Sequence, residues 1–209
     1  MVGARNLALG ITNPAIIGDI NGILINPASI GDGRSYPFSY TNQKIMSFFD
    51  YTTFHIASPY DFSFTIEDVP FNQKIFFAAG LGSNSLDKIP ETTYVDNRIR
   101  QLNTFKAGFD VAHFSVATQF FNIFGINSLA TGINTKFIRQ YIGAKERNAF
   151  GIDLGIIASY YLNYDYIDSI HFGVSFLNAF STPLIWKDKT DETYLPLDVL
   201  VGLQLEINP

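Results

Sequence analysis

The residues of this chain that could bind a metal or act as a base are few and lie far apart. Its histidines are His55, His113 and His171, and each lies in a strand-like pattern without the short ligand spacing of metal sites. The chain has no cysteine, which excludes thiolate metal sites and cysteine nucleophiles. It also lacks the G-x-S-x-G, H-E-x-x-H, P-loop and Rossmann fingerprints. We therefore expect neither enzyme activity nor a cofactor or metal, and we interpret the histidines as structural.

A second group of polar residues repeats with the period of an extended strand. Asn134, Lys136, Asp153 and His171 each lie on the polar side of a segment whose alternate residues are apolar. Side chains at this spacing share one face of a sheet. They could line a passage for a substrate, or they could hydrogen-bond one another and fill the interior. The sequence leaves both alternatives open.

Strands must therefore position these side chains. The 20 Phe and 11 Tyr residues favour strands over helices. The clearest alternation is the apolar face formed by Leu195, Leu197, Val199, Val201, Leu203, Leu205 and Ile207. A change of phase near His113 predicts a β-bulge there. We expect strands over about 37–43, 46–58, 62–66, 73–83, 102–121, 127–141, 148–162, 168–180 and 195–207.

The charge of the chain limits its partners. A net charge of −5 argues against a nucleic-acid surface, because phosphate binding needs clustered Lys and Arg. The sequence has no run of about 18 apolar residues, the length that a membrane-spanning helix needs. We therefore expect any membrane span to be built from strands.

Alternation alone does not show whether the apolar faces meet a protein core or lipid, because soluble β-sandwiches have the same pattern. The later predicted strands are longer than the usual five or six residues, and a tilted strand of this length can cross a bilayer. Short turns at 122–126 and 163–167 alternate with long polar loops at 83–101 and 181–194. Aromatic residues gather near the ends of the runs, as at Tyr160, Tyr161, Trp186 and Tyr194. These features favour a transmembrane barrel.

Short motifs follow one another in a recognisable order. The N-terminal part has Gly3-Ala4-Arg5-Asn6-Leu7-Ala8-Leu9-Gly10, Gly18-Asp19-Ile20-Asn21-Gly22 and Asn26-Pro27-Ala28-Ser29. The rest has Asp87-Lys88-Ile89-Pro90, Gly132-Ile133-Asn134-Thr135-Lys136-Phe137-Ile138, Gly151-Ile152-Asp153-Leu154-Gly155 and Leu195-Pro196-Leu197. Over most of its length the chain resembles the FadL-like and PorV/PorQ-type outer-membrane β-barrel proteins.

The resemblance implies an all-β fold, an antiparallel transmembrane β-barrel in the bacterial outer membrane with an N-terminal plug, or hatch. Residues 1–35 would form the hatch and residues 36–209 the barrel strands. We interpret Asp19, Asn26, Pro27 and Ala28 as hatch residues, with a merely structural turn as the alternative, because Asn26 readily caps a turn and Pro27 fixes the backbone. Asn134, Lys136, Asp153 and His171 would face the barrel lumen. Because barrels of this family have fourteen strands and this chain supplies eight or nine, we expect the native chain to continue beyond Pro209.

The resemblance implies two functions. The first is uptake of hydrophobic small molecules such as long-chain fatty acids, through a barrel embedded in membrane lipid and past a moving hatch. The alternative is a PorV-like scaffold or secretion accessory that holds a secreted or surface protein and transports nothing. An apolar lumen pocket beside the hatch would favour the first, and a long partner-binding extracellular loop the second. A soluble β-sandwich is a third class, which requires that the apolar faces pack on each other.

Overall fold

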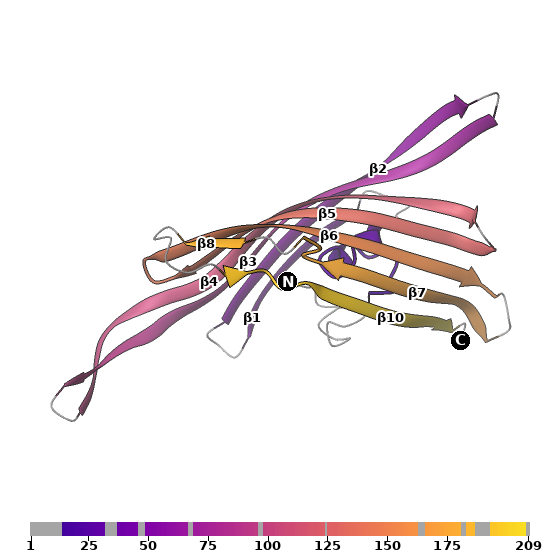
Figure 1. Ribbon diagram of the computed structural model, residues 1–209. Coiled ribbons are helices and arrows are strands. Elements are labelled where there is room, and N and C mark those ends of the chain that lie inside the picture. The colour runs from indigo at the N-terminus through magenta and orange to yellow at the C-terminus, as the bar shows by residue number, and fades with distance from the viewer. Residues whose placement is uncertain are drawn as a thin grey trace.

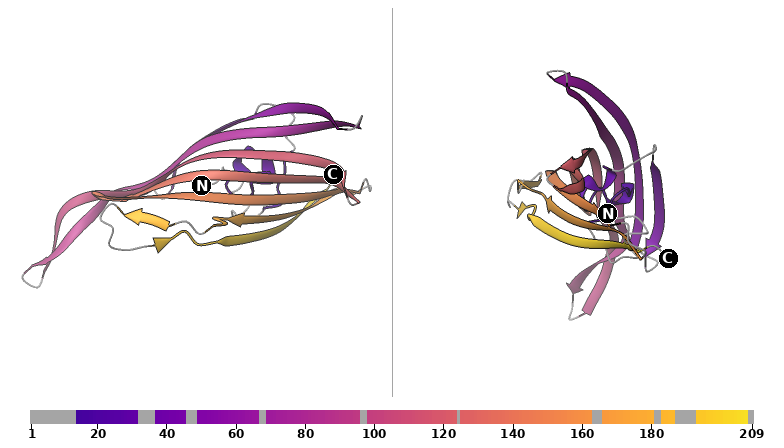
Figure 2. Two further views of the ribbon diagram at one scale, coloured as in Figure 1. Left: turned by 45° about the horizontal axis from the view of Figure 1, so that its top comes forward. Right: turned by 90° about the vertical axis from the view of Figure 1, so that its right-hand side faces the viewer.

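The computed structural model of the chain is all-β. It describes residues 14–31, 37–45, 49–66, 69–95, 98–123, 125–162, 166–180, 183–186 and 193–207. One antiparallel sheet joins β1 (Phe38–Ile45), β2 (Phe49–Ile66), β3 (Val69–Val95), β4 (Arg98–Ile123), β5 (Ile126–Ile142), β6 (Lys145–Tyr161), β7 (Ile167–Leu177) and β10 (Asp198–Ile207), in that order. The short strands β8 (Pro183–Trp186) and β9 (Thr193–Tyr194) lie off this path, and β8 pairs with β6. The sheet curls into a half-barrel (Figures 1 and 2).

The N-terminal segment, residues 14–31, lies against the concave face of this half-barrel (Figure 2). It contains two short 3-10 helices, η1 (Ile20–Gly22) and η2 (Pro27–Ile30). The side chain of Asp19 caps η1, and the side chain of Asn26 caps η2, whose first residue is Pro27. A short polar side chain before a proline suits this position, because it accepts a hydrogen bond from a free backbone N–H. The first motif, Gly3 to Gly10, lies outside the described residues.

The two faces of the sheet differ sharply in composition. Alternate residues of each strand point to opposite faces, so a period of two in the sequence becomes two surfaces. The concave face carries small and polar side chains, most of them buried. The convex face is apolar and exposed, with Phe54, Ile56, Phe77, Leu81, Phe114, Ile133, Phe137, Phe150, Leu154, Ile156, Phe172, Phe176, Val199, Val201, Leu203, Leu205 and Ile207.

The buried core lies between the N-terminal segment and the concave face. In the described part of the chain no second sheet covers the convex face, so the packing that a soluble β-sandwich requires is not found there. Within the same residues, no helix is long and apolar enough to cross a membrane.

The prediction of a long polar loop at 83–101 is wrong. β3 and β4 run through it and pair as far as Val95 and Arg98, forming a hairpin that projects beyond the other strands (Figure 1). Its residues are mostly exposed on both sides, so they show no alternation to reveal a strand. Register shifts after Leu86 and Pro90 accommodate the irregular part of the ladder. Similarly, the runs predicted at 46–58 and 62–66 are one strand, β2.

The β-bulge predicted near His113 is also wrong. The pairing of β4 with β5 is continuous from Ala107 to Phe121, and His113 lies opposite Lys136. The apparent change of phase arises because the apolar residues Val111 and Ala117 lie on the concave face with His113. The N-terminal segment packs on Ala117 and gives it an apolar partner.

Two adjacent isoleucines of β6 offer a matched test of the two faces. Ile156 on the convex face is 46% exposed, whereas Ile157 on the concave face is fully buried. Ile157→Ala is expected to lower the free energy of unfolding by about 2–5 kcal/mol, because it leaves a cavity. Ile156→Ala is expected to lower it by less than about 1 kcal/mol. Urea unfolding measures both, and equal losses would contradict this assignment of the faces.

Candidate functional site

A strip of glycines forms the seat of the N-terminal segment. Gly132, Gly155 and Gly173 lie on the concave face of β5, β6 and β7. A methyl group in place of the glycine hydrogen would overlap with the segment at each position, against Pro27, Asn26 and Pro14 respectively. Only glycine leaves room for the segment to approach the sheet this closely.

Asn26 fastens the segment to two strands. Its side chain is 1% exposed, and its Nδ2 donates to the carbonyl oxygens of Pro14 at 2.7 Å, Ile156 at 3.2 Å and Val174 at 3.4 Å. Its Oδ1 accepts a hydrogen bond from the backbone N of Ala28 at 3.0 Å. A single buried amide therefore joins the beginning of the segment, η2, β6 and β7.

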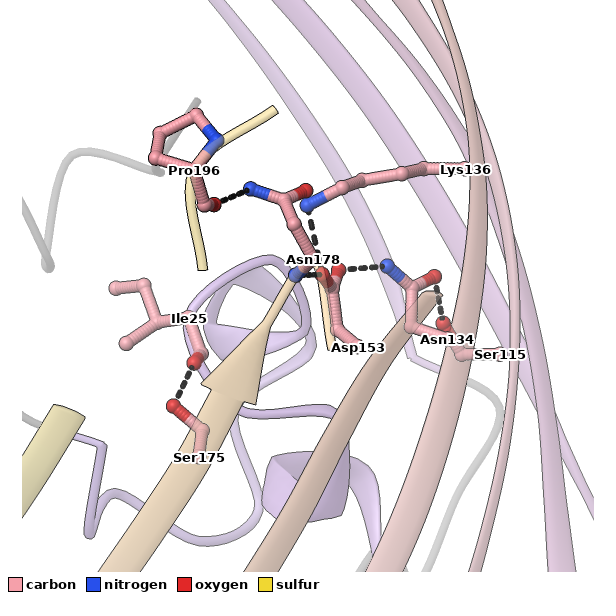
Figure 3. Close-up of polar contacts among 8 residues, drawn as sticks. All are labelled: Ile25, Ser115, Asn134, Lys136, Asp153, Ser175, Asn178 and Pro196. Carbon is pink, nitrogen blue, oxygen red and sulfur yellow. Dashed lines mark hydrogen bonds and ion pairs between the residues drawn. The ribbon is translucent and has the colours of Figure 1, made fainter. Parts of the chain in front are cut away.

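A second direct bond joins the segment to β7. The hydroxyl of Ser175 donates to the carbonyl oxygen of Ile25 at 2.6 Å (Figure 3). Pro27 and Ala28 follow in η2 and are buried, and Ala28 packs with Ala130 and Ile157 of the sheet. Backbone and side-chain contacts thus hold η2 in one place on the concave face.

The segment also covers an apolar patch inside the half-barrel. Three isoleucines of the segment pack on four residues of β2, β3 and β4; the set is Ile20, Ile23, Ile30, Ala57, Phe76, Ala78 and Ala117. Phe76 is the largest of the sheet residues in this patch and is 2% exposed. An apolar patch therefore lies on the concave face of β2, β3 and β4, and the segment covers it.

Three of the polar residues predicted from the sequence meet in one network (Figure 3). The fully buried carboxylate of Asp153 accepts from Asn134 Nδ2 at 2.8 Å, from Lys136 Nζ at 2.7 Å and from the backbone N of Asn178 at 2.8 Å. Asn134 Oδ1 in turn accepts from the hydroxyl of Ser115 at 2.6 Å. These side chains hydrogen-bond one another, as the second alternative expects, and their lining of a passage stays a prediction.

His171 lies on the same face but in a separate group. Its Nδ1 is 2.8 Å from the hydroxyl of Ser159, and its Nε2 is 2.9 Å from the hydroxyl of Ser169. The Ser169 hydroxyl also donates to Glu206 of β10 at 2.9 Å. The side chain of Asp19 caps η1 and takes no part in the contacts that Asn26 makes. The structure thus distributes the predicted residues over four places: the Asp153 network, the His171 group, Asp19 at η1, and Asn26 with Pro27 and Ala28 at η2.

No sequence pattern predicted a pair of buried histidines. His55 Nδ1 and His113 Nε2 lie 3.0 Å apart, although 57 residues separate them in the chain. β3 pairs with β2 on one side and with β4 on the other, so both histidines lie opposite its Gly80, whose lack of a side chain leaves room for the two rings. Only the strand register could have predicted this contact. In the described residues, no group of three His, Asp or Glu side chains could hold a metal ion.

The class that the fold and these contacts define is a half-barrel with an apolar convex face and a polar concave face, on which an N-terminal segment lies. Comparisons with protein families, with curated proteins and with solved structures found no match for the chain. The resemblance of its short motifs to outer-membrane proteins therefore stays a prediction.

The glycine seat can be tested with two substitutions on one face of β6. In an Ala28→Cys background, Gly155→Ala is expected to speed labelling of the cysteine by a water-soluble maleimide, because the methyl group displaces Asn26. Gly151→Ala is the matched control, since its methyl group meets the flexible side chain of Lys136. Mass spectrometry gives the labelling rates. A Gly155→Ala protein that labels no faster than the control would contradict the close seat.

The polar network makes a second prediction. Asp153→Ala is expected to cost about 3–5 kcal/mol of unfolding free energy, because it leaves the Lys136 ammonium buried without its carboxylate. Adding Lys136→Met should restore part of the loss. The exposed pair Lys44 and Asp50 is the control, and Asp50→Ala should cost at most about 1 kcal/mol. Urea unfolding compares these three variants with the unaltered protein. A double variant no more stable than Asp153→Ala would show that the ion pair is unimportant.

Proposed function

We propose that this chain forms part of a β-barrel of the bacterial outer membrane, that the barrel admits hydrophobic small molecules such as long-chain fatty acids, and that the N-terminal segment is its gate. The proposal covers the membrane location, the hatch role of the segment and the transported class of molecule. The observation that carries it is the apolar patch beneath the segment.

The exposed convex face supports the membrane location. Its apolar residues extend over residues 150–158 of β6 and 199–207 of β10. At about 3.4 Å per residue each stretch is about 27 Å long. A strand tilted by about 40° would then cover about 20 Å, close to the ~25 Å apolar band of a transmembrane barrel. An apolar surface of this extent on a soluble protein would drive association.

The patch beneath the segment supports passage of an apolar molecule. With the segment in place, Phe76, Ala57, Ala78 and Ala117 are covered by its isoleucines. If the segment moves away, these side chains face the lumen and offer an alkyl chain the contacts that the isoleucines had. Gate opening and ligand binding would then use the same surface, so an apolar ligand would offset the cost of exposing it.

A second candidate function has its own support. The hairpin of β3 and β4 projects beyond the sheet and exposes apolar side chains, among them Ile99 and Leu102 at 75% and 58%. A PorV-like scaffold or secretion accessory could hold a secreted or surface protein there and transport nothing. This candidate needs no movement of the N-terminal segment, which separates it from the first.

A reversible lock on the segment tests the gate. The chain has no cysteine, so Ala28→Cys with Ala130→Cys, two positions of one buried cluster, provides the only thiols. Uptake of radiolabelled oleate is measured in cells of a host that lack their own long-chain fatty-acid channel. We expect oxidation of the double variant to abolish uptake and a reductant to restore it, because a disulfide holds η2 on β5.

Each single-cysteine variant is the control and should keep its uptake under both conditions. Recovery of the protein from the outer-membrane fraction, with gel mobility that changes on heating, establishes its location first. Uptake that continues through the oxidised double variant would exclude the segment as the gate. A protein found only in the soluble fraction would remove the transport proposal altogether.

A further inference from the structure

A groove on the convex face lies where that face changes from polar to apolar. Its lining includes two adjacent rows of cross-strand neighbours on β3, β4 and β5. The groove has a volume of about 480 Å³. The polar row is Ser83, Asp110 and Arg139, and the apolar row is Leu81, Ala112 and Phe137. The groove therefore offers a polar half and an apolar half to an amphiphile that lies along the strands.

Ala112 forms the floor of the apolar half. Its two neighbours in the row, Leu81 and Phe137, are large side chains that are 61% and 50% exposed. They stand on either side of a side chain that is only a methyl group, so the row has a depression at its centre. An alkyl chain lying in this depression contacts apolar atoms below it and on both sides. The apolar half thus fits one alkyl chain directed along β4.

The polar half carries two opposite charges that are paired with other groups and not with each other. Asp110 lies directly opposite Arg139 on the neighbouring strand. Its Oδ1 accepts from the hydroxyl of Ser83 at 2.7 Å, whereas Arg139 Nη2 donates to Glu146. A carboxylate has two acceptor oxygens and a guanidinium has five N–H groups, so both side chains can bind a further partner. The polar half can therefore receive an anion and a cation at the same time.

We propose that this groove binds a phospholipid with a phosphoethanolamine head. The lipid phosphate accepts from Arg139, its ammonium donates to Asp110, and one acyl chain lies over Ala112. Side chains opposite each other in an antiparallel pair are about 5 Å apart, a spacing that a phosphate and an ammonium joined by two methylene groups can bridge. The inference rests on the proposed membrane location, and it concerns a lipid held on the outside of the barrel, apart from any transported molecule.

The pair of charges distinguishes this head from those of other phospholipids. Phosphatidylglycerol has the phosphate but no ammonium, so its negative charge would lie beside Asp110 without compensation. Phosphatidylcholine has a cation without an N–H group, which cannot donate a hydrogen bond to the carboxylate. Both lipids leave Asp110 without a new donor. The groove is therefore expected to select phosphatidylethanolamine over either of them.

Native mass spectrometry of the full chain in detergent tests the inference. The protein is mixed with equal amounts of phosphatidylethanolamine and phosphatidylglycerol that have the same acyl chains but different masses. We expect the ethanolamine lipid to dominate the complex with one bound lipid. Arg139→Gln should weaken its binding about tenfold, the size of one hydrogen bond to a charged group. Asp110→Asn should lower the preference for it over the glycerol lipid by about the same factor.

Two controls match these variants and a third that fills the groove. Ala112→Leu occupies the floor and should weaken the binding of both lipids, whereas Ala158→Leu, beside Phe172 on the convex face and outside the groove lining, should not. The ion pair of Lys44 with Asp50 is exposed and also lies outside the lining, so Asp50→Asn should leave the lipid preference unchanged. Gel mobility that still changes on heating shows that each variant is folded.

The outcomes separate this inference from the proposed function. A protein found only in the soluble fraction would overturn both. A protein of the outer-membrane fraction that binds the two lipids equally would overturn the phosphoethanolamine site and leave the proposed transport standing. A preference that Arg139→Gln, Asp110→Asn and Ala112→Leu all leave unchanged would also overturn the site, because the lipid would then bind elsewhere on the protein.

Discussion

The polar side chains of the concave face need hydrogen-bond partners within the molecule, because most of them are buried. Most of the contacts described above follow from this requirement. Asp153 is surrounded by three donors, His171 lies between two hydroxyls, and the amide of Asn26 uses both of its ends. Exceptions remain among the described residues, and Thr53 Oγ1, His55 Nε2 and His113 Nδ1 are three of the buried polar atoms without a hydrogen-bond partner.

The segment is attached to its seat in two chemically different ways. On the side of β6 and β7 it is held by directional hydrogen bonds from Asn26 and Ser175, over a floor of glycines. On the side of β2 to β4 it is held by isoleucines on an apolar patch. Directional bonds fix the position of η2 closely, whereas an apolar contact can be exchanged for another apolar molecule at little cost. The second attachment is the one that a ligand could replace.

Local sequence patterns predicted the structural features that depend only on residues close together in the chain. The period of two gave the strands and the polar face of Asn134, Lys136 and Asp153, and the Asn-Pro pair gave the cap of η2. The contact of His55 with His113 could not be predicted, because it depends on the register of three strands. The β3 and β4 hairpin was mistaken for a loop, since strands exposed on both faces have no alternation. Nothing local in the sequence revealed that Gly132 and Gly155 provide clearance for the segment.

The order of the strands constrains how the half-barrel can close. Every neighbouring pair on the path from β1 to β10 is antiparallel, and the path has eight strands, so its two edge strands run in opposite directions. A wholly antiparallel barrel can therefore be completed by joining the two edges directly or by inserting strands in pairs, whichever polypeptide provides them. A single inserted strand would be parallel to one of the edges. Because the described sheet has an even number of strands on this path, any closed antiparallel barrel built on it also has an even number of strands.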